Sequence, residues 1–246
     1  GYEMDFENLE AVCDDKCRIL ILSNPHNPAG IVWPRETLER LASFCHSRGI
    51  IVISDEIHCD MALFGNRHIP FASVSPEAAA CSITFGAPSK TFNIAGIVSS
   101  YSVVPNDSLR HRFHEWMEAN EMNAAPLFSP IATIAAFRKG EEWRKQMLEY
   151  VEGNINFLTD YCREKMPEIK PLRPQASFLV WLDCRSLGLD HDQLIDLFIN
   201  KSGLALNDGE MFNPGGQGFM RLNVGTPRKI LKSALDRLHK AISENL

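Results

Sequence analysis

Short apolar runs alternate with helix-like segments along the first half of the chain. The runs that predict strands are residues 18–23 (RILILS), 50–54 (IIVIS), 81–85 (CSITF) and 98–104. Between the first two runs, Pro34 and Gly49 bound a segment whose apolar residues recur at helical spacing. Apolar runs without alternation are typical of strands covered on both faces, as in parallel sheets with helices above and below. The pattern therefore predicts an α/β fold with a mainly parallel sheet.

The second half of the chain has a different pattern. Amphipathic segments predict helices at residues 108–118, 131–138, 141–165 and 190–201, with a last helix after Pro227. A group of prolines ends the third of these helices: Pro167, Pro171 and Pro174. Shorter apolar runs predict strands at residues 178–182, 204–206 and 219–223. We therefore predict part of a larger α/β domain in residues 1–140 and a smaller α+β domain in residues 141–246.

Composition and charge exclude several classes of protein. The 246 residues are 45% hydrophobic and 23% charged, which is typical of a globular protein. Lys and Arg number 25 against 31 Asp and Glu, so no basic excess is present to bind nucleic acid. No apolar run is long enough to span a bilayer, and no signal-like segment opens the sequence. Seven cysteines without a Cys-x-x-Cys pair predict reduced thiols in a cytoplasmic protein, with no metal site.

Polar residues follow three of the predicted strands, where the carboxyl ends of a parallel sheet form a ligand crevice. They include Asn27 in residues 23–30, Asp55 in residues 54–58 and Lys90 at the end of residues 86–90. Each has an ordinary structural interpretation as well. Asn-Pro pairs form turns, an acid after a strand can cap a helix, and a lysine is commonly a surface charge. Their occurrence at successive strand ends favours a shared chemical role.

That role fits an aldehyde cofactor that contains a pyridine ring. A lysine can form a Schiff base with the aldehyde, and an aspartate can keep the ring nitrogen protonated so that the ring accepts electrons. An asparagine amide and a polar group three residues after the aspartate, here His58, can bind the phenolic oxygen. As a single residue, His58 would more commonly be a structural histidine.

Four motifs resemble those of fold-type I pyridoxal-phosphate enzymes of the class I/II aminotransferase family. They are residues 24–30 (NPHNPAG), 54–58 (SDEIH), 87–93 (APSKTFN) and 221–225 (RLNVG). The second and third are most similar to the cystathionine β-lyase, or C–S lyase, branch of that family. Aspartate aminotransferases usually carry Tyr where His58 stands. The resemblance covers nearly the whole chain, and it places the sequence in the C-terminal part of such an enzyme.

The resemblance implies a role for six residues and implies pyridoxal 5'-phosphate as the cofactor. Lys90 would be the Schiff-base lysine and proton shuttle, and Asp55 the partner of the pyridine nitrogen. The remaining roles are contacts with the phenolic oxygen, the phosphate and the substrate α-carboxylate, carried by Asn27 with His58, by Ser89 and by Arg221. An arginine suits a carboxylate because its planar fork donates two parallel hydrogen bonds, although a lone strand arginine is usually a surface ion-pair partner.

The implied activity is elimination from cystathionine or another cysteine conjugate, giving pyruvate, ammonia and a thiol. An aminotransferase remains open because the same residues serve transamination, and a non-catalytic truncated module remains open as well. The resemblance also implies a homodimer that binds a small amino-acid substrate, with no nucleic acid or membrane partner. One position departs from the family. Many aminotransferases place a phosphate-binding Arg eight residues after the lysine, where this sequence has Val98, so other groups must anchor the phosphate.

Overall fold

The computed structural model describes residues 2–212 and 214–245. The chain divides into two compact units, which are considered separately. The first unit is Gly1–His26 with Ile31–Lys145, and the second is Asn27–Gly30 with Gln146–Leu246. None of the helices in the described residues combines the length and apolar character that a bilayer crossing requires.

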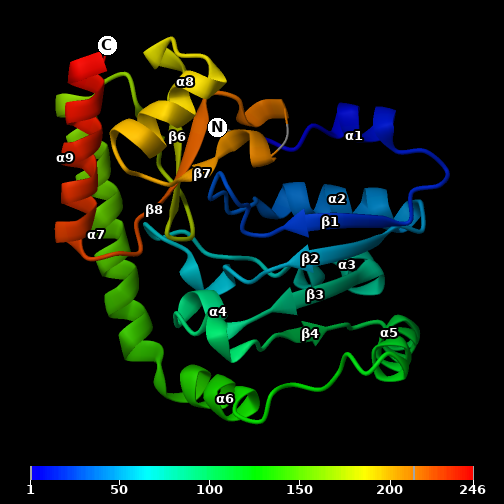
Figure 1. Cartoon of the computed structure of the whole chain (residues 1–246). Coiled ribbons are helices and arrows are strands. Elements are labelled where there is room, and N and C mark those ends of the chain that lie inside the picture. The colour runs from blue at the N-terminus through cyan, green and yellow to red at the C-terminus, as the bar shows by residue number, and fades with distance from the viewer. Residues whose placement is uncertain (1, 213, 246) are drawn as a thin grey trace. The chain divides into compact units, whose positions relative to one another are not determined.

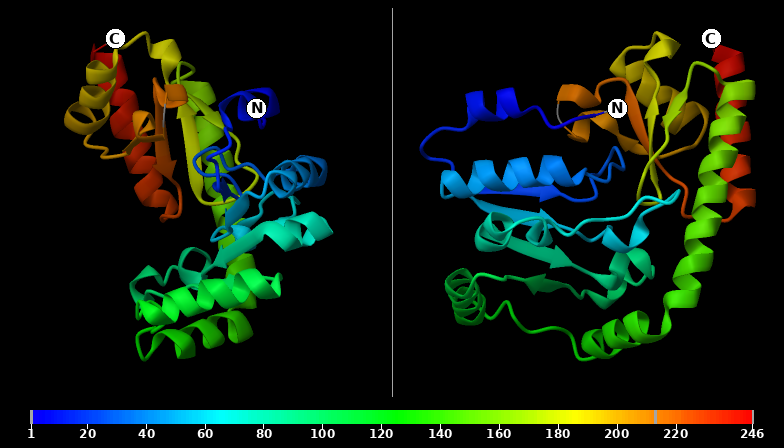
Figure 2. Two further views of the ribbon diagram at one scale, coloured as in Figure 1. Left: turned by 90° about the vertical axis from the view of Figure 1, so that its right-hand side faces the viewer. Right: turned by 180° about the vertical axis from the view of Figure 1, so that it is seen from behind.

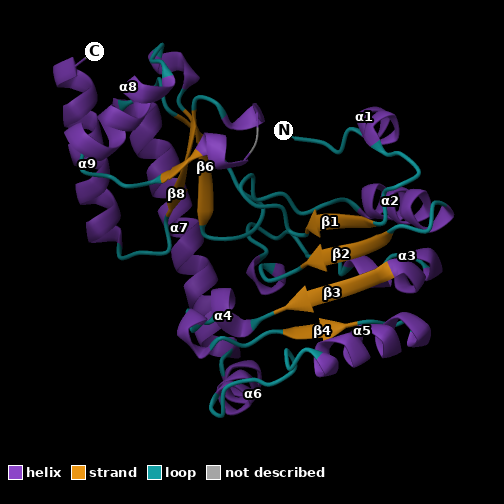
Figure 3. Ribbon diagram, turned by 45° about the vertical axis from the view of Figure 1, so that its right-hand side comes forward, coloured by secondary structure: helices purple, strands orange, loops and turns teal. Residues whose placement is uncertain are grey.

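The first unit is built on a four-stranded sheet in the order β1-β2-β3-β4 (Figure 3). The strands are β1 (Ile19–Ser23), β2 (Ile51–Asp55), β3 (Ser82–Gly86) and β4 (Tyr101–Val103). The first three are parallel, with Ser23 beside Asp55 and Asp55 beside Phe85, whereas β4 is antiparallel to β3. The predicted mainly parallel sheet is therefore confirmed. The carboxyl ends of β1, β2 and β3 all lie at one edge of this sheet.

The helices of this unit include three that the sequence predicts and three short ones that it does not. They are α1 (Phe6–Val12), α2 (Arg35–Ser47), α3 (Pro76–Cys81), α4 (Pro88–Thr91), α5 (Asp107–Ala119) and α6 (Ser129–Lys139), with short 3-10 turns η1 (Cys59–Met61), η2 (Phe71–Ser73) and η3 (Ala95–Ile97). The predicted helices are α2, α5 and α6, and the others are α1, α3 and α4. Helix α2 starts after Pro34 and ends before Gly49, whose φ is +67°. Its Leu38 and Leu41 pack with Val52 of β2 and with Phe71 in one core cluster. Burying each such side chain stabilises the unit by about 1.5–3 kcal/mol.

The first strand differs from the prediction, because only one of its faces is covered. Ile19 and Ile21 are 61% and 77% exposed, whereas Leu22, the residue after Ile21, is buried. Strand β1 pairs only with β2 among the described strands, and the side chains of Ile19 and Ile21 remain largely exposed. An apolar run in the sequence marks what a strand can bury, but it does not show what lies against it.

The second unit combines an antiparallel sheet with two long helices. Its sheet has the order β5-β6-β8-β7, formed by β5 (Lys170–Leu172), β6 (Leu179–Asp183), β7 (Asn207–Asp208) and β8 (Phe219–Asn223). Its helices are α7 (Glu141–Lys165), α8 (His191–Asp196) and α9 (Arg228–Asn245), with a π-helical turn, η5 (Leu197–Lys201), after α8 and short 3-10 turns η4 (Arg185–Leu187), η6 (Gly209–Phe212) and η7 (Pro214–Gly216). Residues of α7 up to Lys145 belong to the first unit. Helices α7 and α9 run side by side (Figures 1 and 2), where Tyr161 Oη donates a hydrogen bond of 2.7 Å to Asp236 Oδ1.

Two short elements of the second unit differ from the prediction. Residues 204–206 form no strand, since they follow Gly203 at φ +64° and the Leu204 amide bonds back to the Phe198 carbonyl. The strand β7 begins directly after them. Strand β5 was not predicted, because Pro171 lies inside it. A proline is tolerated there because β5 is an edge strand and pairs only with β6 among the described strands.

Candidate active site

Asp55 is the last residue of β2, and its surroundings hold both its backbone and its side chain. Its carbonyl oxygen accepts a hydrogen bond of 2.9 Å from the Asn24 amide. Its Oδ1 atom accepts one of 3.2 Å from the amide of Ile57, two residues further on. Among the described residues, no hydrogen bond to Oδ2 is present. The structure therefore presents a half-buried carboxylate with one oxygen available to a ligand.

Lys90 lies in α4, the short helix that follows β3, the strand next to β2. Pro88 starts this helix, and the Phe92 amide closes it on the Pro88 carbonyl at 2.9 Å. The side chain of Lys90 is half-buried, and its ammonium group forms no ion pair or hydrogen bond with any described residue. Structural lysines that leave water are usually paired with an acid. An unpaired amine is what a reaction with an aldehyde requires.

His58 and Ser89 lie beside these two residues in the sequence and belong to the same unit. His58 is 5% exposed and precedes the turn η1, where its carbonyl accepts the Met61 amide at 3.0 Å. Ser89 is half-buried in α4, directly before Lys90. Cys59 follows His58, and burial raises the pKa of its thiol to about 12. That thiol is consequently protonated at neutral pH, which excludes it as the nucleophile of this site.

Arg221 lies in the middle of β8, in the second unit, and its guanidinium group is held on two sides. Nη1 donates to Asn27 Oδ1 and Nη2 donates to Asn207 Oδ1, both at 2.8 Å. The guanidinium carbon lies 4.7 Å from the centre of the Phe212 ring, a cation–π distance. Burial lowers the pKa of Arg221 from its ordinary value, and its Nε atom is buried without a hydrogen-bond partner among the described residues. The structure therefore fixes the direction of a partly desolvated cation.

Asn27 belongs with Arg221 rather than with the unit of Asp55. Its segment, Asn27–Gly30, is tied to the second unit through the Gly30 carbonyl, which accepts the Gln175 amide at 2.7 Å. Gly30 has φ +66°, and a Cβ atom there would lie 2.5 Å from Pro174 Cβ, so only glycine fits. The sequence places Asn27 a few residues after a strand of the first unit. Nothing in the sequence indicates its hydrogen bond to Arg221.

Two residues beside the predicted site residues were not singled out by the sequence analysis. Asn207 binds Arg221 because β7 pairs with β8 in a register that sets Asn207 opposite Arg221. That strand was predicted three residues too early, which hid the pairing. Glu56, the neighbour of Asp55, is 3% exposed and was not singled out. A buried carboxylate next to the proposed ring aspartate would have been the signal.

One cleft of the first unit is lined by Glu56 but by none of the predicted site residues. It has a volume of about 630 Å³ and is lined among others by Cys59, His68, Thr84, Tyr101 and Arg144. None of the six residues predicted for the site lines it. The candidate site is consequently defined by the side chains described above and not by this cleft.

The chain matches the model of the family described as Aminotransferase class I and II over residues 1–238. The protein therefore belongs to this family, as the motifs predicted. Among its relatives, "Cystathionine beta-lyase PatB" of Bacillus subtilis (strain 168) is 40% identical over 99% of this chain and 63% of its own length. "Protein MalY" of Escherichia coli (strain K12) is 34% identical over 98% of this chain and 62% of its own length.

A solved structure agrees with the sequence comparisons. Cystalysin from Treponema denticola, whose crystal structure contains a pyridoxal 5'-phosphate cofactor, matches with a TM-score of 0.95 at 31% sequence identity. The match covers 99% of this chain and 62% of the cystalysin chain. The predicted aminotransferase-like α/β fold is confirmed. The chain spans slightly less than two thirds of the length of each of these relatives.

Proposed function

We propose that the full-length protein is a pyridoxal-phosphate-dependent C–S β-lyase that acts on cystathionine or a related cysteine conjugate. The observation that carries this proposal is the half-buried amino group of Lys90, which has no acidic partner in the described residues and follows the strand beside that of Asp55. Support also comes from relatives that are named cystathionine beta-lyase and from a neighbour that holds the cofactor.

The donor set of the described residues fits pyridoxal 5'-phosphate. Lys90 offers an unpaired amine to the aldehyde, and Asp55 offers an unoccupied carboxylate oxygen to the ring nitrogen. We assign the phenolic oxygen to Asn27 with His58 and one phosphate contact to Ser89. Val98 lies at the position where many aminotransferases have an arginine, so Ser89 is a weak anchor by itself. When bound, the cofactor supplies a ring that accepts electrons from the substrate α-carbon.

The chain's own residues then orient the amino acid and move its proton. Arg221 binds the α-carboxylate through its fork, a geometry that Asn207 and Asn27 keep in place. Lys90 Nζ takes the α-proton as a general base. The Cβ–S bond breaks with its electron pair on sulfur, and water converts the remaining three-carbon amine to pyruvate and ammonia. A thiolate is a good leaving group, so elimination requires little beyond removal of the proton.

An aminotransferase is the second candidate, and the name of the matched family favours it. The same lysine, aspartate and arginine serve transamination, in which the proton returns to the cofactor rather than a thiol leaving. The products separate the two functions. A lyase gives pyruvate and a thiol in equal amounts from cystathionine alone, whereas a transaminase requires a keto acid and releases no thiol.

We also propose that the protein is a cytoplasmic homodimer. All seven cysteines are free thiols, which suits a reducing compartment. The first unit exposes large apolar side chains, among them Trp116, Leu127 and Phe128 at 57%, 79% and 72%. Exposed apolar groups of this size favour association. Light scattering of the full-length protein tests the dimer, and a monomeric mass at micromolar concentration would contradict it.

Product analysis tests the activity. The full-length protein is incubated with pyridoxal 5'-phosphate and L-cystathionine, and pyruvate and free thiol are measured against time. The proposal predicts equal amounts of both without an added keto acid. Turnover that requires a keto acid would establish the aminotransferase instead, and binding of cofactor with neither product would favour a non-catalytic module.

A further inference from the structure

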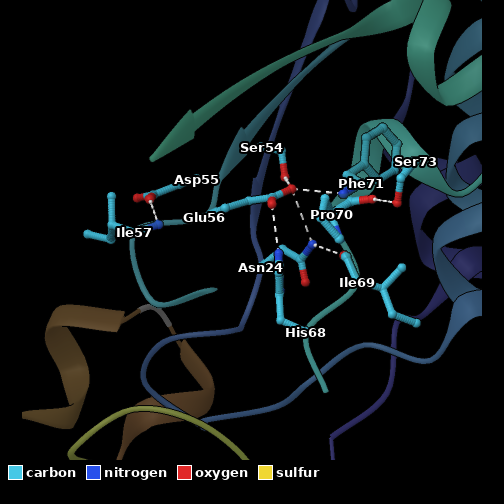
Figure 4. A network of polar contacts seen from close by, with 10 residues as sticks. All are labelled: Asn24, Ser54, Asp55, Glu56, Ile57, His68, Ile69, Pro70, Phe71 and Ser73. Atoms are coloured by element: carbon cyan, nitrogen blue, oxygen red, sulfur yellow. Dashed lines mark hydrogen bonds and ion pairs between the residues drawn. The ribbon is translucent and has the colours of Figure 1, made fainter. Parts of the chain in front are cut away.

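The carboxylate of Glu56 is the centre of a buried network in the first unit (Figure 4). Its Oε1 atom accepts hydrogen bonds from Ser54 Oγ at 2.8 Å and from the Phe71 amide at 2.8 Å. Asn24 Nδ2 approaches the same oxygen at 3.4 Å. Its Oε2 atom lies 2.7 Å from Nε2 of His68. Glu56 is 3% exposed, and Ser54 and Asn24 are at most 1% exposed.

The pattern of donors defines how this network works. The Phe71 amide and Asn24 Nδ2 can only donate, and the Ser54 hydroxyl donates because a carboxylate has no hydrogen to give. The carboxylate accepts through both of its oxygens. His68 therefore donates through Nε2. A buried carboxylate is costly unless hydrogen bonds replace its water, and four converging donors supply that replacement. Loss of the carboxylate would leave Ser54 Oγ, the Phe71 amide and His68 Nε2 without this acceptor. Asn24 would keep its hydrogen bond to the Ile69 carbonyl, so Glu56 is the common acceptor of the network but not its only link.

The network joins three segments that are far apart in the sequence. Ser54 lies in β2 and Glu56 directly follows that strand, Asn24 follows β1, and residues 68–71 lead into the turn η2, which begins at residue 71. Asn24 also donates from Nδ2 to the Ile69 carbonyl at 3.0 Å, which adds a direct link between two of these segments. These hydrogen bonds connect the carboxyl ends of β1 and β2 to residues 68–71.

Asp55 lies between Ser54 and Glu56 in the chain, and its side chain points away from that of Glu56 (Figure 4). Successive side chains of a strand alternate in direction, so Glu56 on one side holds the backbone from which Asp55 projects on the other. The Asn24 amide binds the Asp55 carbonyl, and the Glu56 amide continues the ladder to the Phe85 carbonyl at 2.8 Å. Asn24 therefore contacts Asp55 through its backbone and Glu56 through its side chain.

We propose that Glu56 is a positioning residue for Asp55, an inference that rests on the proposed function. Through Asn24 and Ser54 it fixes the backbone of Asp55 and hence the place where the free carboxylate oxygen meets the ring nitrogen of the cofactor. Glu56 itself touches neither cofactor nor substrate in this role. Its removal changes the electronic state of the bound cofactor, whereas a merely structural carboxylate would change stability alone.

The test compares three variants of the full-length protein loaded with pyridoxal 5'-phosphate. Glu56→Ala removes the acceptor. Glu56→Gln keeps one side-chain oxygen as the acceptor for Ser54, Asn24 and the Phe71 amide. Its new NH2 group faces His68 and can donate to Nε2 when His68 is in its other tautomer. Asn106→Ala is the matched control, because Asn106 in the same unit caps α5 and donates to the Ala80 carbonyl at 3.0 Å. The readouts are cofactor affinity by equilibrium dialysis, the pH titration of the cofactor's absorbance band, and kcat with KM.

We expect Glu56→Ala to weaken cofactor binding and lower kcat by about tenfold or more, because small misplacements at a site cost this much. Its absorbance titration should shift while KM stays within about threefold, because Arg221 is untouched. Glu56→Gln should restore affinity and absorbance nearly to wild type. Asn106→Ala should lower the melting temperature and leave the other readouts unchanged.

Two results overturn the inference. If wild type binds the cofactor on Lys90 but Glu56→Ala changes affinity and absorbance no more than Asn106→Ala, the positioning role is wrong and the proposed function stands. If wild type forms no cofactor absorbance band, the proposed function is wrong and this inference fails with it. Should Glu56→Ala not fold, Ser54→Ala removes one donor only and must shift the absorbance titration in the same test.

Discussion

Replacing Arg221 tests whether this residue binds the α-carboxylate of the substrate. Two nitrogens of the guanidinium group are directed by Asn27 and Asn207, and Nε is buried without a partner among the described residues. Arg221→Ala removes the charge and both directed donors. Arg221→Lys keeps the charge but loses the planar fork, so it should retain only part of the binding.

The size of the effect follows from the burial of this cation. Removing one partner of a desolvated, hydrogen-bonded charge pair costs about 2–5 kcal/mol. Arg221 is only half-buried, so we expect about 2–4 kcal/mol for Arg221→Ala, which is about a 30- to 1000-fold loss in kcat/KM. Most of the loss should appear in KM, because the carboxylate is bound in both ground state and transition state.

The assay measures kcat/KM for L-cystathionine and for its α-amide with wild type, Arg221→Ala and Arg185→Ala. Arg185 is a suitable control because it lies in the second unit as well but is exposed and pairs with an acid, Asp183, at 2.7 Å. Wild type should prefer the acid, and Arg221→Ala should lose that preference while Arg185→Ala keeps it. An equal loss for acid and amide in Arg221→Ala would refute the assignment.

Three further predictions concern other parts of the chain. Lys90→Ala should lower turnover by several orders of magnitude, because the general base at the α-carbon is lost, and a rate within tenfold of wild type in the pyruvate assay would contradict this. Burial lowers the pKa of His26 below its ordinary 6.5, so the unfolded state binds more protons and the free energy of unfolding falls from pH 7 to pH 5. His26→Phe keeps the ring contact with Trp33 and should reduce that fall in urea titrations; an unchanged pH dependence would contradict it. Residues 1–246 expressed alone should bind pyridoxal 5'-phosphate weakly, since Ser89 is their one assigned phosphate contact, and retention of stoichiometric cofactor in gel filtration would contradict this.

The sequence predicted the long, strongly periodic elements well. Helix α7 and strand β8 begin and end at the predicted residues. A sustained apolar stripe defines the helix, and an apolar run bounded by turns defines the strand. Short elements were predicted less accurately. The strand predicted at residues 204–206 is replaced by β7, since Gly203 turns the chain and the pairing partner decides where the strand starts.

The site shows the same division between local and non-local information. The sequence places Asp55 at the end of one apolar strand and Lys90 shortly after the next, and parallel strands bring their carboxyl ends to one edge. The partners of Arg221 could not, because Asn27 and Asn207 lie 194 and 14 residues away along the chain. Glu56 reads in sequence as an acid in a loop. Only its burial and its four donors mark it as an anchor.

The attachment point of the cofactor tests the central claim most directly. The full-length protein is saturated with pyridoxal 5'-phosphate, reduced with borohydride, digested and analysed by mass spectrometry. The proposed function predicts one pyridoxyl group per chain, on the peptide that contains Lys90. Stoichiometric labelling of another lysine, or of none, would contradict it.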